Sequence, residues 1–177
     1  MTTAPIHGVV IRDLVMHADD RGAFAELFRS SWFAGANPML QSNLSVSRAG
    51  VLRGMHYHKR QADYWCVQDG IAFVCLYDLR AGSPTQRTAA TFTFDATRGL
   101  SGLFIPAGIA HGFSAVSEVR LQYLVDTEFS GDDELGFAWD DPDLGVRWPL
   151  DRPILSDRDR SNPRLAAALA DPPPFGR

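Results

Sequence analysis

The chain has five histidines, and three of them lie in two short segments with other reactive side chains. The first segment contains His56, His58 and Asp63, and the second contains His111. Imidazole and carboxylate groups serve as general acids and bases, and they also bind divalent metal ions. These two segments are therefore the candidates for a catalytic or metal-binding site.

The spacing in the first segment matches a metal-binding motif of the cupin fold. On a β-strand, His56 and His58 point to the same face and can project together into a barrel, and Asp63 follows after a turn. In the second segment, Pro-x-Gly-x-x-His ends at His111, as in the second cupin motif. The resemblance implies one divalent ion, such as Zn, Fe, Ni or Mn, bound by His56, His58, Asp63 and His111. Alternatively, a cupin-like barrel keeps these histidines for other work and binds no metal.

Around these segments, apolar and polar residues alternate with the period of two that is typical of β-strands. The clearest runs are residues 70–80, 87–95, 102–108 and 119–129. Clusters of Gly, Pro, Ser and Asp separate the runs at short intervals, which is typical of a sandwich or barrel. We predict an all-β fold, a cupin jelly-roll β-barrel with short peripheral helices.

Helical patterns are sparse and limited to residues 30–36 and 163–172. A chain of 177 residues is long enough for one domain with a core and short for two. We predict a single cupin-type domain over residues 1–177. Its parts are N-terminal strands with a short helix in 1–45, the barrel core in 46–130, and C-terminal strands, a short helix and a tail in 131–177.

The composition argues against several classes of protein. Hydrophobic residues make up 45% of the chain and charged residues 21%, which is typical of a folded protein rather than a disordered one. A net charge of −4 gives no basic field for nucleic acid or an anionic membrane. No apolar run is long enough to cross a membrane and no signal-peptide pattern is visible, so we expect a cytoplasmic protein. Cys66 and Cys75 lack CxxC spacing and are expected to be free thiols.

Six long segments, in order along nearly the whole chain, resemble one enzyme family. They are DDRGAFAELF (19–28), QSNLSVSRAGVLRGMHY (41–57), DLRAGSPT (78–85), IPAGIAHGF (105–113), ELGFAWDDPDLGVRWP (134–149) and LSDRDR (155–160). The family is that of the dTDP-4-dehydrorhamnose 3,5-epimerases. The resemblance implies a jelly-roll barrel, no required cofactor, a nucleotide-sugar ligand, and a homodimer in which an N-terminal strand crosses to the partner.

The resemblance also implies the catalytic groups. Protons on C3 and C5 of a 4-keto sugar are acidic because they lie next to the carbonyl, and a base of near-neutral pKa can remove them. His56 matches the base of the family, Asp159 the carboxylate that orients it, and Tyr123 the acid that returns the proton to the other face.

Further positions match those that bind substrate in the family. Guanidinium groups suit a diphosphate, and an aromatic ring can pack on the nucleotide base. The candidate substrate-binding residues are Arg21, Phe24, Glu26, Gln41, Asn43, Arg53, Lys59 and His111.

Three positions depart from the family and bear on the mechanism. Asp63 stands where the family has a lysine that stabilises the enolate, Val74 replaces an aspartate, and His58 replaces the usual glutamine. The loop between His56 and the next strand is also shorter. The changes to His58 and Asp63 are those that create the cupin metal motif.

These departures leave several hypotheses for the function open. In one, a metal ion replaces the lysine as electrophile, and Tyr123 or a metal-bound hydroxide removes the proton, because His56 cannot be both ligand and base. In a second, no metal binds, His56 and Asp159 act together, and Lys59 serves the enolate. In a third, the barrel is a metal-dependent oxygenase, cyclase or lyase. In the last, it is a non-catalytic module that binds sugar nucleotides.

Overall fold

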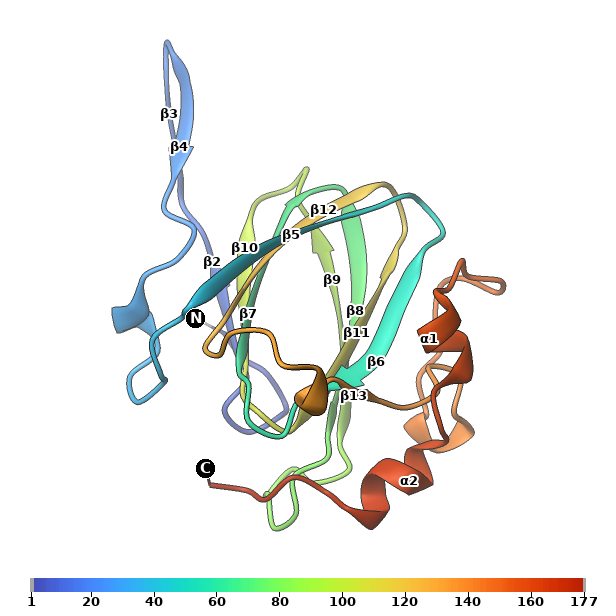
Figure 1. The fold of residues 1–177 in the computed structure, drawn as a ribbon. Coiled ribbons are helices and arrows are strands. Elements are labelled where there is room, and N and C mark those ends of the chain that lie inside the picture. Colours follow the sequence, from blue (N-terminus) through green and yellow to red (C-terminus); the bar gives the residue numbers. More distant parts are fainter. Residues whose placement is uncertain (1, 177) are drawn as a thin grey trace.

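The computed structural model describes residues 2–176 as a jelly-roll barrel of two antiparallel sheets, with short helices outside it (Figure 1). One sheet has, in spatial order, β1 (Thr2–Thr3), β2 (Val10–Asp13), β10 (Ser101–Ile105), β7 (Asp63–Asp69), β12 (Val119–Val125) and β5 (Gln41–Ser47). The other has β13 (Leu135–Gly136), β6 (Leu52–Tyr57), β11 (Ile109–Ala115), β8 (Ile71–Asp78) and β9 (Ala89–Asp95). The predicted all-β jelly roll is confirmed.

The barrel core lies between the two sheets. Leu76 from one sheet and Leu103, Ile105 and Leu121 from the other are at most 2% exposed and belong to the same apolar cluster. At about 25 cal/mol for each Å² of apolar surface removed from water, such side chains are the main stabilising contribution. The core therefore holds the two sheets together, and Trp65, Phe113 and Leu121 of the same cluster also line the cavity described below.

Strand β8 is buried on both faces. Val74 and Leu76 face the barrel core, whereas Cys75 and Tyr77 pack in a second apolar cluster that includes Leu165 of the C-terminal segment. This second cluster covers the outer face of the five-stranded sheet. The C-terminal segment is thereby fixed against the sheet that carries the histidines.

Strands β6 and β11 approach each other closely beside the site. His56 on β6 and His111 on β11 are register partners, and the pairing is irregular between His111 and Phe113. A Cβ atom on Gly112 would lie 2.9 Å from the Arg53 carbonyl oxygen, so only glycine fits at this position. The close approach fixes the two histidine backbones relative to each other.

The helices are short and peripheral. They are the 3₁₀ helices η1 (Ser30–Trp32), η2 (Gly131–Asp133) and η3 (Pro142–Leu144), and the α-helices α1 (Asp157–Ser161) and α2 (Leu165–Ala170). Helix α2 lies within the predicted 163–172. Residues 30–36 form only the single turn η1, which ends at Phe33; the Phe33 ring stacks on that of Phe104, with the ring centroids 4.7 Å apart. Among the described residues, no helix is long and apolar enough to cross a membrane.

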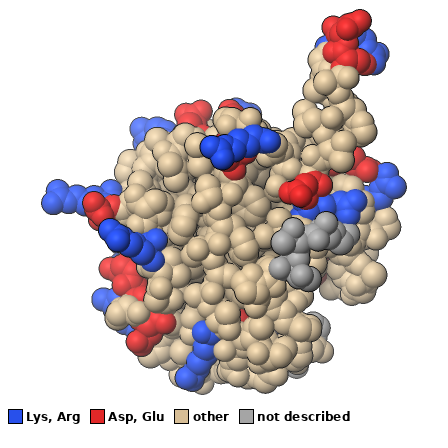
Figure 2. All heavy atoms as spheres, turned by 180° about the vertical axis from the view of Figure 1, so that it is seen from behind, with Lys and Arg blue, Asp and Glu red and all other residues tan. Residues whose placement is uncertain are grey.

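A β-hairpin of β3 (Met16–Asp19) and β4 (Gly22–Ala25) projects away from the barrel (Figure 1). Seven of its eight strand residues are exposed. Acidic and basic side chains meet at its tip (Figure 2), where Arg21 Nη2 lies 2.6 Å from Asp19 Oδ2. The hairpin therefore gains little from packing within the chain.

Both cysteines are buried and free, as predicted. Burial raises the pKa of the Cys66 thiol to about 11 and that of Cys75 to about 12. Both therefore stay protonated at neutral pH and act as small apolar side chains of the core.

Candidate active site

A cavity of about 210 Å³ lies between the two sheets and contains most of the predicted catalytic and metal-binding residues. Both sheets and the C-terminal segment contribute to its wall. The lining residues are Ser45, Arg53, His56, His58, Gln61, Asp63, Trp65, His111, Phe113, Leu121, Tyr123, Glu134 and Arg158.

His56 and Asp159 form a hydrogen-bonded dyad at one wall of this cavity. Nε2 of His56 lies 2.5 Å from Oδ1 of Asp159, and Ser156 Oγ donates to Oδ2 at 2.8 Å. Ser156 is also the N-cap of α1, since its hydroxyl accepts the Asp159 amide, so the start of the helix places the carboxylate. Because the carboxylate accepts from Nε2, the other ring nitrogen, Nδ1, is the one left for proton transfer.

The pKa of Asp159 lies below its ordinary value. Burial of the carboxyl raises the pKa, but the hydrogen bond and charge of His56, with hydrogen bonds from Ser156 and the Gly54 backbone, lower it by more. Asp159 is therefore ionised at neutral pH and can stabilise a protonated His56 imidazole.

Tyr123 lies on β12, in the sheet opposite His56. Burial of the phenol, followed by the nearby Asp63 and Glu134 carboxylates, raises the pKa of Tyr123 above its ordinary value. The hydroxyl therefore carries its proton at neutral pH and is able to donate it.

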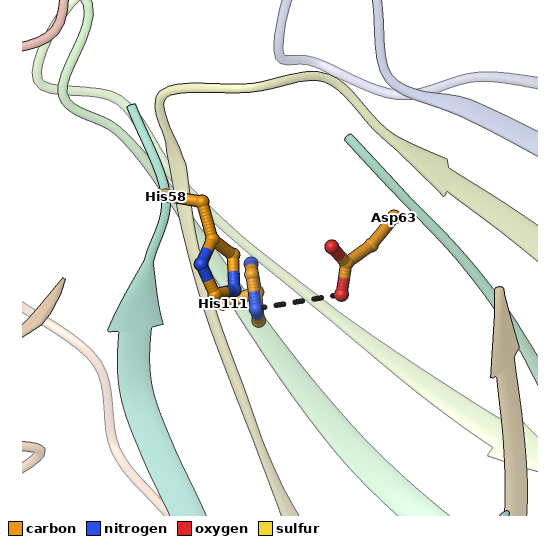
Figure 3. Close-up of side chains that lie close together, drawn as sticks. All are labelled: His58, Asp63 and His111. Carbon is orange, nitrogen blue, oxygen red and sulfur yellow. Dashed lines mark ion pairs between the residues drawn. The ribbon is translucent and has the colours of Figure 1, made fainter. Parts of the chain in front are cut away.

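His58, Asp63 and His111 form a second cluster in the same cavity (Figure 3). One donor atom from each of the three side chains lies within 4.8 Å of the others, and all three residues are buried. Nε2 of His111 is 3.8 Å from Oδ2 of Asp63. The structure does not bring His56 into this group, because its imidazole is turned to Asp159; the predicted set of four metal ligands is thus reduced to three.

Hydrogen bonds outside the cluster orient each member. Nδ1 of His58 is 2.7 Å from the Asp133 carbonyl oxygen, and Nδ1 of His111 is 3.1 Å from that of Ile109. Carbonyl oxygens only accept, so Nδ1 of each ring is the donor and Nε2 carries the lone pair. Burial lowers the pKa of His111 to about 4, with nearby Asp63 acting in the opposite direction, so the ring is neutral at pH 7.

Lys59 does not reach the cavity. Its Nζ lies 2.5 Å from Asp171 Oδ2, on a separate surface hollow. The Asp133 carboxylate accepts the backbone amides of Lys59 and Arg60 at 2.8 and 3.0 Å, which fixes the turn with the lysine side chain outward. The geometry does not support the expected contact of Lys59 with an enolate in the cavity.

The predicted nucleotide-binding residues fall into two groups. Arg53 lines the cavity, and Gln41 and Asn43 lie on β5, joined by a hydrogen bond of 2.8 Å. Arg21 and Phe24 are exposed on the β3–β4 hairpin, and Glu26 just after it pairs with Arg29 at 2.7 Å. Arg21, Phe24 and Glu26 do not line the cavity, and neither do Gln41 and Asn43.

Six further polar or aromatic residues of the cavity escaped the sequence analysis, among them Phe113, which follows His111 by two positions on β11. Ser45 follows Asn43 by two positions on β5, and that alternation was a usable signal. Gln61, Trp65, Glu134 and Arg158 had no such signal. Glu134 and Arg158 pair at 2.9 Å, and only the tertiary fold brings their loops to the cavity.

Comparisons with known proteins agree with this geometry. The sequence profile of dTDP-4-dehydrorhamnose 3,5-epimerase matches residues 3–167. The dTDP-4-dehydrorhamnose 3,5-epimerase of Pseudomonas aeruginosa is 37% identical over 94% of this chain and 96% of its own, and that of Streptomyces griseus is 35% identical over 94% and 86%.

Solved structures show the same fold. The crystal structure of a 3'-monoepimerase from Streptomyces bikiniensis in complex with dTDP-quinovose superposes with a TM-score of 0.89 at 34% identity, covering 99% of this chain and 93% of that one. The resemblance seen in the sequence is confirmed, and with it the class of enzyme, an isomerase. The chain belongs to the dTDP-4-dehydrorhamnose 3,5-epimerase family of nucleotide-sugar epimerases.

Proposed function

We propose that the protein inverts a carbon next to the ketone of a dTDP-linked 4-keto-6-deoxy sugar. The observation that carries the proposal is the placement of the His56–Asp159 dyad and Tyr123 on opposite sheets around one cavity. A base and an acid on opposite sides of a ring are what inversion requires, since the proton leaves one face and returns to the other.

The proton transfer can be followed group by group. Nδ1 of His56 takes the proton from the carbon next to the ketone, the C–H electron pair moves toward the carbonyl, and an enolate forms. Asp159 holds the ring through Nε2 and offsets the charge that the imidazole gains. Tyr123 then gives its proton to the opposite face; the phenolate regains a proton from solvent, and His56 releases the proton that it took.

We further propose a homodimer in which the β3–β4 hairpin of one chain completes the nucleotide site of the other. Phe24 is 68% exposed and Arg21 is exposed, although both occupy family positions for substrate binding. The dTDP moiety would then extend from the cavity to the partner's hairpin. Relatives at 36% identity are named dTDP-4-dehydro-6-deoxyglucose 3-epimerase, so inversion at C3 alone and at both C3 and C5 are both represented among the relatives.

The direct test is deuterium incorporation from D₂O into dTDP-4-dehydro-6-deoxyglucose, followed by mass spectrometry and NMR. We expect deuterium at C3, and at C5 as well if both carbons are inverted. His56→Asn should lower incorporation by about 10³-fold, the scale of a lost general base. His7→Asn, at an exposed histidine outside the cavity, is the matched control and should not change it.

One result would favour a binding module instead of an enzyme. If dTDP raises the melting temperature but the wild-type protein incorporates no deuterium, the chain binds sugar nucleotides without enolising them.

A further inference from the structure

We propose that His58, Asp63 and His111 bind one divalent transition-metal ion, and that this ion faces the substrate ketone as its electrophile. The ion site stands on geometry alone, whereas its role as electrophile rests on the proposed function. The starting observation is that three buried donor atoms from separate parts of the fold lie within 4.8 Å of one another (Figure 3). Tetrahedral Zn–ligand bonds of about 2.0–2.2 Å place donors about 3.3–3.6 Å apart, so rotation about side-chain torsions brings the donors together when an ion binds.

The hydrogen bonds around the cluster are those of a metal site. Both histidines donate Nδ1–H to a backbone carbonyl, which leaves Nε2 of each as a lone-pair donor. Gln61 Nε2 and Trp65 Nε1 donate to the two oxygens of Asp63 at 2.9 and 3.0 Å and fix the carboxylate plane. Partners of this kind orient metal ligands and set the histidine tautomer.

The buried negative charge of Asp63 also favours a cation at this cluster. Asp63 is 3% exposed, and among the described residues no lysine or arginine pairs with it. Its nearest basic group is His111, at 3.8 Å, which is too long for a hydrogen bond. A buried carboxylate is costly without a counter-charge, and a divalent ion at this point supplies one.

Because this cluster and the dyad are separate, no histidine has to act both as base and as metal ligand. His56 is engaged by Asp159, so the base and the metal ligands are different histidines. Two histidines and one carboxylate leave coordination positions open for substrate, an arrangement suited to Fe, Zn, Co or Ni.

Two arginines also line the cavity, and one of them is neutralised by a carboxylate. Arg53 Nε donates to Ser47 Oγ at 2.9 Å, and Arg158 pairs with Glu134. The single lysine of the chain is held by Asp171 outside the cavity. As His56 takes the proton and the electron pair moves onto the carbonyl oxygen, the metal ion would offset that negative charge as a Lewis acid.

The test is a titration of metal-free full-length protein with Co²⁺, read by visible absorption, and with Zn²⁺, read by calorimetry. We expect one equivalent to bind. Asp63→Asn and His58→Gln should each weaken binding by about 100-fold or more, because each removes a ligand. His56→Asn is the matched control and should keep the affinity and spectrum of the wild type.

Three outcomes would overturn the ion site: no binding at millimolar metal, binding unaffected by Asp63→Asn, or loss of binding in His56→Asn equal to that in Asp63→Asn. If Asp63→Asn does not fold, His111→Gln takes its place, and a metal-induced rise in melting temperature that is present in the wild type and absent in the variant supports the site.

Proton exchange separates the two proposals. Metal removal should slow deuterium incorporation by at least 10²-fold, and re-addition should restore it; an unchanged rate in the metal-free protein contradicts the role as electrophile. One bound equivalent with no exchange in any dTDP-4-keto sugar would overturn the proposed function and leave the ion site standing.

Discussion

The cavity and the β3–β4 hairpin both carry residues expected to meet the substrate, yet they are built in opposite ways. In the cavity, Asp63 and His111 are 3% and 5% exposed and each has hydrogen-bond partners within the chain. On the hairpin, Phe24 is 68% exposed. The cavity residues are thus held in place by contacts within one chain, whereas the hairpin residues are not; under the proposed function, the first group sets the rate and the second adds to nucleotide binding. Rate and affinity should therefore respond to different mutations.

The largest effect is expected from Tyr123→Phe, which should slow inversion without stopping proton exchange. This change removes the acid and keeps the base, so inversion should fall by about 10³-fold, while His56 still exchanges the proton on its own face. Deuterium incorporation measured together with product stereochemistry will show whether exchange persists without inversion. If exchange and inversion fall in parallel, Tyr123 is not the acid of the second face.

The hairpin should show the reverse pattern. Phe24→Ala is expected to raise KM for the dTDP-sugar by about 10-fold, the scale of one lost aromatic–base stack, with kcat little changed. Steady-state kinetics checks this, and Phe175→Ala, which removes another exposed aromatic ring outside the cavity lining, is the matched control. A fall in kcat at unchanged KM would remove the hairpin from nucleotide binding.

The smallest expected effect concerns the stability that the Asp159 carboxylate gives to the folded chain. The pKa of Asp159 is lower in the folded chain than its ordinary value of 3.8, so its ionised form contributes stability above that pH. The contribution is lost as pH falls through the lowered folded pKa. The difference in unfolding free energy between the wild type and Asp159→Asn should therefore be larger at about pH 5 than in more acidic solution, where it shrinks. Urea denaturation across this range measures it; a difference that grows on acidification contradicts the lowered pKa.

The same contrast explains which parts of the molecule could be predicted. Strand periodicity predicted β8, β9, β10 and β12 because their side chains alternate against a core. The partnership of His56 with Asp159, 103 positions away, came from resemblance to a family and not from periodicity. The local sequence pattern does not show which residues so far apart in the chain come into contact.

Predictions were weakest where a distant group decides a side chain's direction. Lys59 lies close to His56 in sequence, but the Asp133 carboxylate, 74 positions later, holds its backbone and turns it outward. His56 and His58 share the cavity as expected, yet they join different clusters because Asp159 engages the first and the Asp133 carbonyl the second. Tertiary hydrogen bonds outweighed spacing at both positions.

The placement of His111 on β11 has a consequence for motion. All seven residues of this strand are buried, and it lies between β6 and β8 with ladders on both sides. Amide hydrogens in such a strand exchange with solvent only when large parts of the protein open, whereas those of the edge strand β5 exchange through local fraying. The backbone that carries His111 should therefore rank among the most slowly exchanging parts of the molecule, whereas that of Gln41 and Asn43 on β5 should exchange faster.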